Sequence, residues 1–402
     1  MQTVILAAGE GTRMRPLTDA LPKPMVPLLD RPLVEHVADA AVEAGASALV
    51  FVIGYRGEAV REHFGDEHRD VPVRYAVQDE QGGTADAVEA AREALHREPF
   101  VVLNGDVLLA GEDLRRLYQQ APAIAVAAVE NPTRYGVLEV NDDTTRATGI
   151  VEKPIDPPSN LANAGAYAFP ATALDHVGDV SESVRGEREL TDVLDVICET
   201  HTVTPVEVSR WRDVGRPWDL LEATEDRLPE VASARAGTIS DDSTLTDPVV
   251  VEPGAEIRGG VHLEGPVLVR SGATIGPNAY VRGCSVIGPD ATVGHAVEIK
   301  NSILFPGATV GHQSYVGDSL IGPDANLGAG TNIANLRHDG EPVRTTVKGD
   351  VVSTDRRKYG AVLGADVKTA INTSLNAGVV LDTGTMTEPG EVILRSRMER
   401  GQ

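Results

Sequence analysis

A six-residue repeat in the second half of the chain constrains its fold more than any other feature. Aliphatic residues recur there at an unbroken spacing of six, at Val251, Ile257, Leu263, Val269, Ile275, Val281, Ile287, Val293 and Ile299. After a shift of one residue the pattern continues at Leu304, Val310 and Val316, and after another shift at Ile321, Leu327 and Ile333. A hexapeptide period places one aliphatic side chain per flat strand on the axis of a triangular coil. We therefore predict an all-β, left-handed parallel β-helix over residues 249–402.

The first half has a different pattern, in which aliphatic runs alternate with helix-like stretches. The runs cover residues 3–8, 48–54, 100–106 and 124–130, and the helix-like stretches cover residues 31–45 and 84–98. Strands that alternate with helices indicate a parallel sheet with crossover helices, whose ligands bind at the carboxyl ends of the strands. We predict an α/β, Rossmann-like domain over residues 1–226, followed by a linker over residues 227–248.

Charge and composition restrict the class of partner and the location. The net charge of −24 argues against a nucleic acid, because phosphate backbones bind excess Lys and Arg. Acidic residues are spread over both halves and only six lysines occur, which indicates adaptation to high salt. No apolar run of about 18 residues is present, so we expect no membrane span. Two cysteines, one in each half, favour a reducing cytoplasm over a disulfide framework.

A glycine-rich turn follows the first predicted strand. Ala8, Gly9, Gly11 and Thr12 form this turn, and Arg13 and Lys23 add positive charge close by in the sequence. Glycines allow backbone N–H groups to approach phosphate oxygens, and the two cations suit a triphosphate. By itself such a turn could be only structural.

The longer pattern G-x-G-T-R followed by P-K-P-M-x-P-L resembles the signature of the sugar-nucleotide pyrophosphorylases. The resemblance implies transfer of a nucleotidyl group from a nucleoside triphosphate to a sugar 1-phosphate, with release of pyrophosphate. It assigns Arg13 and Lys23 to catalysis and Asp106 and Asp213 to Mg2+. It also assigns residues to the nucleotide base, namely Gln78, Gln81, Gly83 and Thr84, and to the sugar, namely Gly136, Glu152, Lys153 and Asn163.

The nucleotide remains open between two members of this family. The segment Gln78–Thr84 is similar to that of uridylyltransferases acting on N-acetylglucosamine 1-phosphate. Asp213 is closer to thymidylyltransferases acting on glucose 1-phosphate, because the bacterial acetylglucosamine enzymes often carry Asn there. UTP and dTTP are therefore both candidates.

A second motif lies within the repeats, at Gly311–Asp318. It resembles the catalytic segment of the acetyltransferase domain in bifunctional N-acetylglucosamine-1-phosphate uridyltransferases, which makes His312 the general base. The resemblance extends to residues for the amino-sugar phosphate, namely Arg282, Lys300, Tyr315, Asn326 and Asn335, and for acetyl-CoA, namely Ala329 and Ala365. Leu336 and Ala365 depart from the bacterial pattern, and the arrangement is closer to archaeal bifunctional enzymes that accept glucosamine or galactosamine 1-phosphate.

Three other readings compete with a bifunctional enzyme of UDP-N-acetylhexosamine synthesis. One is a monofunctional glucose-1-phosphate thymidylyltransferase with a purely structural β-helix, and another is a mannose-1-phosphate guanylyltransferase. The third is a regulatory subunit, against which the intact Arg13, Lys23, Asp106 and Asp213 argue. Because such coils associate side by side, we expect a homotrimer or a dimer of trimers. Arg395 and Arg397 in the tail could meet coenzyme A phosphates or lie in solvent.

Overall fold

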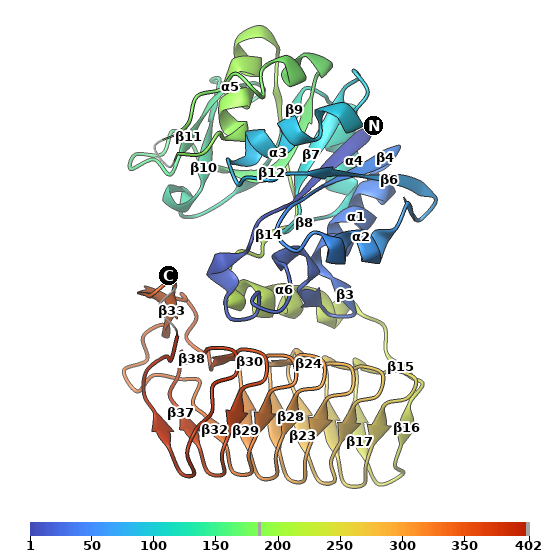
Figure 1. Cartoon of the computed structure of the whole chain (residues 1–402), viewed down its shortest axis with the longest axis vertical. Helices are drawn as coiled ribbons and strands as arrows, with labels where there is room; N and C mark the ends of the chain where they lie inside the picture. The colour runs from blue at the N-terminus through green and yellow to red at the C-terminus, as the bar shows by residue number, and fades with distance from the viewer. Residues whose placement is uncertain (184–185, 399–402) are drawn as a thin grey trace. The chain divides into compact units, whose positions relative to one another are not determined.

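The chain is described by a computed structural model over residues 1–183 and 186–398, which group into two compact units (Figure 1). The first unit comprises Met1–Glu10, Pro22–Met25 and the described part of Arg31–Val214. The second comprises Gly11–Leu21, Val26–Asp30 and the described residues from Gly215 onward. Within the described ranges, no helix combines the length and apolar character that a membrane crossing requires.

A ten-stranded sheet forms the centre of the first unit, with the main order β11-β10-β12-β7-β1-β4-β6-β5, while β9 pairs with β12 and β13 pairs with β9. Its strands are β1 Gln2–Ala7, β4 Ala48–Ile53, β5 Glu67–His68, β6 Val71–Val77, β7 Phe100–Asn104, β9 Ala123–Ala128, β10 Gly136–Val140, β11 Ala147–Glu152, β12 Leu161–Phe169 and β13 Thr204–Glu207. The predicted parallel pairing holds for β7, β1, β4 and β6. Strand β12 pairs antiparallel with β7, β9 and β10, so the sheet is mixed. No α-helix lies between β9 and β12, and strands joined without a crossover helix run antiparallel.

Helices cover both faces of this sheet. They are α1 Leu33–Ala44, α2 Glu58–Phe64, α3 Thr84–Ala90, α4 Gly111–Gln119 and α5 Leu190–Thr200. Side chains of α1, α2 and α4 pack in one apolar cluster, and those of α3 and α5 pack in another on the opposite face. The helix predicted at 31–45 is confirmed as α1, which ends at Gly45 with a φ of 102°. The helix predicted at 84–98 is wrong in length, since it ends at Ala90 and a 3-10 turn follows.

Short elements complete both units. The 3-10 helices are η1 Thr12–Met14, η2 Lys23–Met25, η3 Arg92–Ala94, η4 Pro132–Arg134, η5 Ala171–Asp175 and η6 Leu228–Glu230. The remaining short strands of this half are β2 Pro27–Leu28, β3 Arg31–Pro32, β8 Val107–Leu109 and β14 Trp211–Asp213, and the helix α6 spans Pro217–Arg227.

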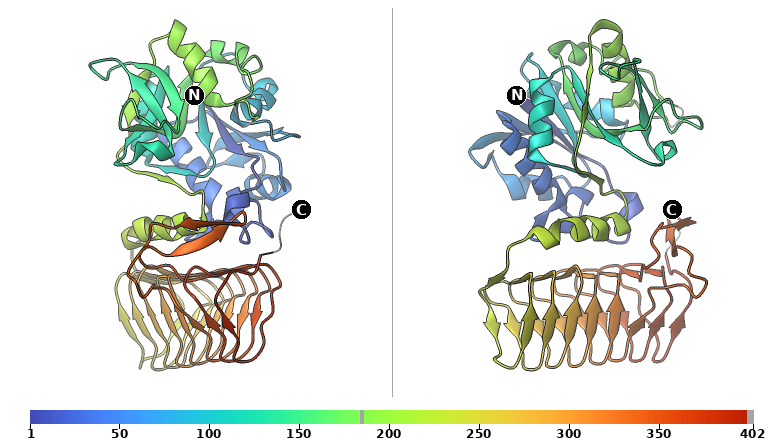
Figure 2. Two further views of the ribbon diagram at one scale, coloured as in Figure 1. Left: turned by 90° about the vertical axis from the view of Figure 1, so that its left-hand side faces the viewer. Right: turned by 180° about the vertical axis from the view of Figure 1, so that it is seen from behind.

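The second unit contains a parallel coil with three flat faces, and Figure 2 shows its successive turns stacked one beside the next. The first face consists of β15 Ala234–Arg235, β18 Val249–Val251, β21 Val267–Val269, β24 Ser285–Ile287, β27 Ile303–Leu304, β30 Leu320–Ile321, β35 Val362–Leu363 and β38 Val380–Leu381. The second consists of β16 Thr238–Ile239, β19 Glu256–Ile257, β22 Thr274–Ile275, β25 Thr292–Val293, β28 Thr309–Val310, β31 Asn326–Leu327 and β36 Lys368–Thr369. The third consists of β17 Thr244–Thr246, β20 His262–Glu264, β23 Tyr280–Arg282, β26 Glu298–Lys300, β29 Tyr315–Gly317, β32 Asn332–Ile333, β37 Ser374–Leu375 and β39 Val392–Ile393.

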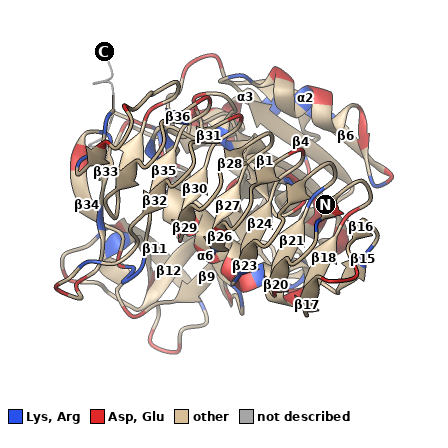
Figure 3. Ribbon diagram, turned by 90° about the horizontal axis from the view of Figure 1, so that it is seen from below, with Lys and Arg blue, Asp and Glu red and all other residues tan. Residues whose placement is uncertain are grey.

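The repeat analysis is confirmed by the core of this coil. All fifteen aliphatics of the repeat lie in one buried cluster along the axis, and none is more than 1% exposed. Val249 pairs with Val267, which is a step of 18 residues, whereas Val286 pairs with Ile303, which is a step of 17. The predicted shift in register is therefore a coil shortened by one residue. Figure 3 shows charged residues mainly at the turns and margins of the coil, so most of its strands carry none.

The chain leaves the coil once, between β32 and β35. This excursion forms an antiparallel hairpin of β33 Arg344–Val347 and β34 Asp350–Ser353. At the other end, strands β15 to β17 already pair with the following coil and lie within the stretch 227–248 that the sequence assigns to a linker. Their side chains are mostly exposed, which is why the aliphatic pattern does not include them.

Candidate active sites

The glycine-rich turn after β1 is a compact loop. Gly11 has a φ of 67°, in the left-handed region that glycine adopts freely. Its carbonyl accepts hydrogen bonds from the backbone N–H of Met14 at 2.8 Å and from the Thr18 hydroxyl at 3.0 Å. These bonds shape the segment that carries Thr12 and Arg13, which belong to the second unit together with Gly11.

Asp106 and Asp213 are backbone neighbours just beyond the end of β7 in the first unit. Asp213 on β14 lies opposite Val107, and the N–H of Val214 donates to the carbonyl of Asp106 at 3.0 Å. Gly105 allows this arrangement, because a Cβ there would overlap the carbonyl of Leu6. Asp106 and Asp213 are thus brought together by the backbone pairing of two strands that are far apart in the sequence.

The Nζ atom of Lys23 forms an ion pair with Asp106. Both side chains are partly buried, with 15% and 28% exposed. The ammonium group of Lys23, which comes from the signature loop, therefore lies next to the carboxylate of Asp106, which follows β7.

This pair of carboxylates fits Mg2+, which binds oxygen ligands and usually keeps several waters. Over residues 1–183 and 186–398, no group of three or more His, Cys, Asp or Glu is arranged to hold a metal. Asp106 and Asp213 would therefore supply one or two protein ligands, and substrate oxygens and water would supply the others.

The segment assigned to the nucleotide base is held by its own side chains. The Gln78 side chain donates to the carbonyl of Gly83 at 3.0 Å, and Gln81 reaches the carbonyl of Ala8 at 3.5 Å. Gly83 has a φ of +116°, and a Cβ there would overlap the carbonyl of Arg188. Thr84 accepts a hydrogen bond from the N–H of Leu190 at 2.8 Å, so its hydroxyl anchors α3.

The residues assigned to the sugar also lie together. Gly136 lies opposite Glu152 in the β10–β11 pair, and a Cβ at Gly136 would be 3.0 Å from Glu152 Oε2 and 3.7 Å from Asn163 Cβ. Lys153 pairs with Glu152 at 3.2 Å. Asn163 donates to the Tyr167 hydroxyl at 2.6 Å, and burial raises the pKa of Tyr167 to about 12. The neutral hydroxyl of Tyr167 therefore holds the Asn163 amide in place. Sequence reasoning missed this role of Tyr167.

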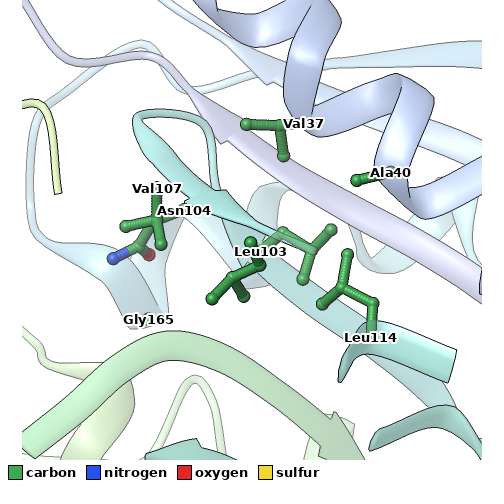
Figure 4. A pocket seen from close by; sticks show the side chains of 8 residues that line it. Val37, Ala40, Leu103, Asn104, Val107, Leu114 and Gly165 are labelled. Atoms are coloured by element: carbon green, nitrogen blue, oxygen red, sulfur yellow. The ribbon is translucent and has the colours of Figure 1, made fainter. Parts of the chain in front are cut away.

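A small cavity of about 10 Å³ lies behind the strand that leads to Asp106 (Figure 4). Leu103, Asn104, Val107 and Gly165 line part of it. A Cβ at Gly165 would be 2.7 Å from the amide nitrogen of Asn104, so glycine makes room for that side chain. The cavity holds at most one water and is part of the packing that supports the site.

A second cluster of polar residues lies on the third face of the coil. Arg282 pairs in register with Lys300, and Glu298 pairs with Tyr315 in the next coil. Arg282 donates to Glu298 at 2.7 Å, and the Asn335 amide donates to the Tyr315 hydroxyl at 3.2 Å. Burial raises the pKa of Tyr315, so its hydroxyl stays protonated near neutral pH.

His312 lies exposed at the turn that precedes Tyr315. Its Nδ1 accepts the backbone N–H of His295 at 3.0 Å. A neutral imidazole has one donor nitrogen and one acceptor nitrogen, so in this arrangement the proton is on Nε2. Acceptance of a proton by Nε2 therefore requires a change of tautomer that frees Nδ1 from the His295 N–H.

The residues assigned to acetyl-CoA lie at different turns. Ala329 follows His312 one coil later, since the N–H of Gly330 donates to the carbonyl of His312 at 2.8 Å. In the following coil, the N–H of Asn372 donates to the carbonyl of Ala329. The exposed Ile371 therefore lies at the corresponding turn of that coil. Ala365 lies at the turn between the first and second faces, so the structure does not bring it to His312.

Asn326 lies on the second face, where it pairs with Thr309 and Lys368. Within this chain the structure therefore does not place it with Arg282 and Lys300 on the third face.

Lys358 is a further residue of this cluster that sequence reasoning missed. It returns from the hairpin excursion to pair with Leu336, and the nearby charge of Lys300 lowers its pKa. Its position depends on where the excursion ends, and the six-residue spacing carries no signal for that.

Comparison with known proteins links both clusters to one family. The chain is 36% identical over 389 residues to the bifunctional protein GlmU of Methanococcus maripaludis, which covers 96% of this chain and 93% of that protein. It is 35% identical over 399 residues to the bifunctional sugar-1-phosphate nucleotidylyltransferase/acetyltransferase of Sulfurisphaera tokodaii, with 98% of each chain covered. This chain belongs to the bifunctional nucleotidylyltransferase/acetyltransferase family.

Each of the other matches covers only one half of the chain. The nucleotidyl transferase family model matches residues 2–230, and the GMPPB C-terminal domain model matches residues 263–392. The UTP–glucose-1-phosphate uridylyltransferase AglF of Haloferax volcanii is 38% identical over 57% of this chain and 97% of its own length. A UDP-glucose pyrophosphorylase structure from Acinetobacter baumanii aligns with a TM-score of 0.53 at 27% identity, covering 57% of this chain and 93% of that one.

Proposed function

We propose that this chain catalyses two reactions of UDP-N-acetylhexosamine synthesis at two separate sites. One site transfers acetyl from acetyl-CoA to glucosamine or galactosamine 1-phosphate, and the other transfers a nucleotidyl group from UTP or dTTP to a sugar 1-phosphate. The observation that carries the proposal is the polar cluster of Arg282, Lys300, Tyr315 and Asn335 on the coil. A coil used only for assembly has no need to gather these residues on one face.

In nucleotidyl transfer, a sugar phosphate oxygen attacks the α-phosphorus of the triphosphate, and the bond to pyrophosphate breaks. The protein aligns two anions and offsets the charge that develops on them. We assign that role to Arg13 and Lys23. Asp106 and Asp213 would hold Mg2+, which neutralises charge on the nucleotide phosphates.

Ligand recognition at this site follows the segments described above. We assign the nucleotide to the glycine-rich turn and to the base segment Gln78–Thr84, and the sugar to Gly136, Glu152, Lys153 and Asn163. Lys153 would contact the phosphate of the sugar. The uridylyltransferase relative supports UTP, whereas Asp213 supports dTTP.

In acetyl transfer, the amine nitrogen attacks the thioester carbonyl, the carbon–sulfur bond breaks and coenzyme A leaves as the thiol. The amine loses one proton, and we assign its acceptance to His312. Arg282 and Lys300 suit the sugar phosphate, and we add Lys358, which pairs with Leu336 next to Asn335. We place acetyl-CoA along the turn of Ala329, next to His312. The sequence assignments of Asn326 and Ala365 remain separate proposals.

Further properties are proposed from composition and repeat architecture. We propose a homotrimer or a dimer of trimers, a protein adapted to high salt, and domains at residues 1–226 and 249–402. Acidic residues number 60 and basic residues 36, which favours solubility in concentrated salt. Two free cysteines support a cytoplasmic location.

A thiol-release assay with acetyl-CoA tests the second site directly. The purified chain in high-salt buffer receives glucosamine 1-phosphate, galactosamine 1-phosphate or no acceptor. We expect release of coenzyme A only with an amino-sugar phosphate. An intact oligomer that releases no thiol with either acceptor would reduce the β-helix to a scaffold and favour the monofunctional thymidylyltransferase.

A further inference from the structure

Asp318 is a carboxylate buried in a coil whose interior is otherwise mostly aliphatic. It follows β29, and only 4% of its side chain is exposed. A buried carboxylate is costly unless it is paired and hydrogen-bonded. Its backbone φ is 52°, in the left-handed region that Asp and Asn tolerate better than most residues.

Three donors converge on this carboxylate from the coils on either side. Lys300 Nζ lies 3.3 Å from Oδ2, and the Asn301 amide donates to Oδ1 at 2.9 Å. From the following coil, the Asn335 amide donates to Oδ2 at 2.5 Å. Two of these partners, Lys300 and Asn335, are residues that we assign to the amino-sugar phosphate.

The hydrogen bonds fix which atom Asn335 presents to a ligand. Its amide nitrogen has two hydrogens, one for Asp318 at 2.5 Å and one for the Tyr315 hydroxyl at 3.2 Å. The carbonyl oxygen Oδ1 is then the polar atom of the side chain left for a ligand, and it can only accept. An acceptor suits an N–H of the amino sugar.

Asp318 also controls the charge next to Lys300. The ammonium of Lys358 is close enough for Lys300 to lower its pKa, while the charge of Asp318 acts in the opposite direction. One N–H of Lys300 is directed to Asp318, which orients the ammonium group. The carboxylate therefore offsets part of the repulsion between these two ammonium groups.

A second layer of contacts holds this arrangement from α6. The Asn301 amide, which donates to Asp318, also donates to Glu225 Oε1 at 2.7 Å. Arg356 donates to Glu225 Oε2 at 3.0 Å and is itself mostly buried. The orientation of Asp318 is thus supported by Asn301, which is itself held by the partly buried ion pair of Glu225 and Arg356.

We infer that Asp318 is a positioning residue for acetyl transfer, which orients the Lys300 ammonium toward the sugar phosphate and the Asn335 carbonyl oxygen toward the amine. This inference rests on the proposed acetyltransferase function of the same site.

Asp318→Asn is the informative substitution, because it keeps the shape and the tolerance of positive φ but removes the charge. We expect the KM for glucosamine 1-phosphate to rise about tenfold or more, as for loss of a charge-assisted hydrogen bond. The KM for acetyl-CoA and the rate of nucleotidyl transfer should stay within about twofold. Asp324→Asn is the matched control, since Asp324 also has a positive φ, 55°, in the same coil but is exposed and distant from the cluster.

The outcomes separate the inference from the function on which it rests. If the wild-type chain releases no thiol with any amino-sugar phosphate, both the proposed function and the inference are overturned. If the wild-type chain is active and a folded Asp318→Asn variant has an unchanged KM for glucosamine 1-phosphate and an unchanged kcat, only the inference is overturned. If that variant does not fold, Asn301→Gly removes one donor at a φ of 46° that glycine accepts. We then expect the KM for glucosamine 1-phosphate to rise about threefold, and an unchanged value overturns the inference.

Discussion

At the scale of single residues, each proposed reaction depends on one group whose surroundings are known. Asp106 forms an ion pair with Lys23 in the first unit, Asp213 lies opposite Val107 next to it, and His312 lies exposed on a turn of the coil. Asp106 belongs to the first unit and His312 to the second. Each reaction should therefore be removable without the other.

We expect Asp106→Ala to reduce nucleotidyl transfer by about 1,000-fold or more and to leave acetyl transfer intact, because the site loses its carboxylate. His312→Ala should reduce acetyl transfer by about 100-fold or more and leave nucleotidyl transfer intact. Pyrophosphate release and thiol release measure the two reactions in one preparation. His262→Ala, on β20 of the third face, is the control for loss of an imidazole. Loss of both activities in either folded variant would contradict the two-site proposal.

Asp195 on α5 provides a prediction about pH. Burial raises its pKa to about 6, although it accepts the N–H of Ile150 at 3.0 Å. A pKa raised in the folded state gives stability that is complete below the unfolded value of about 4 and is lost as pH rises through about 6. Asp195→Asn keeps the acceptor and removes the charge. It should raise the free energy of unfolding at pH 7.5 by about 1 kcal/mol, a value reduced for solvent screening.

Thermal unfolding of this variant at pH 4 and pH 7.5 provides the check. At pH 4 the difference from wild type should shrink to a small fraction of its value at pH 7.5, because Asp195 is then protonated in the folded state and about half protonated in the unfolded state. Asp142→Asn, at an exposed turn, should have no such pH dependence. A stabilisation equal at both pH values would show that charge burial is not its cause.

At the scale of elements, backbone geometry decides where the base segment lies. Gly83 begins α3 with a φ of +116° and leaves no space for a Cβ beside Arg188. Gly45 ends α1 with a φ of +102°, and no atom lies within 4 Å of a Cβ there. The two glycines thus differ in steric space while they share a positive φ.

We expect Gly83→Ala to lower nucleotidyl transfer by about 100-fold through the KM for the triphosphate, because α3 must move away from Arg188. Gly45→Ala carries only the cost of positive φ, about 1 kcal/mol, and should leave the KM unchanged. Acetyl transfer should be normal in both. Kinetics with UTP and dTTP measure the effect, and an equal KM in the two variants would mean that space beside Arg188 is not what matters.

At the scale of the whole molecule, the net charge of −24 sets the response to salt. Unscreened carboxylates repel one another, and salt shortens the range of that repulsion to a few ångströms near 1 M. We expect the Tm to rise by about 10 °C or more between 0.1 M and 2 M KCl. Sucrose at equal osmolality controls for exclusion of solute from the surface. An unchanged Tm would contradict adaptation to high salt.

Local sequence patterns determined much of the fold of this protein and part of its candidate sites. The coil follows from the aliphatic spacing, because each strand needs only one inward side chain and a turn, and both shifts of register appear as shortened coils. Arg282 and Lys300 are 18 residues apart, one full coil, so their alignment was also implicit in the repeat. The order of motifs likewise predicted that Lys23 and Asp106 belong to one site, and the structure pairs them.

Other features were decided only by the tertiary structure. Asp318 looks like an ordinary turn residue, and its role depends on donors from the coils on either side. Lys358 reaches Lys300 only because a hairpin excursion ends beside it. Ala365 was assigned to acetyl-CoA by resemblance, but it lies at the turn between the first and second faces, away from the turn of His312. Local periodicity specifies which residues point inward, whereas contacts between distant segments depend on where the chain returns, and that is set by packing of the whole fold.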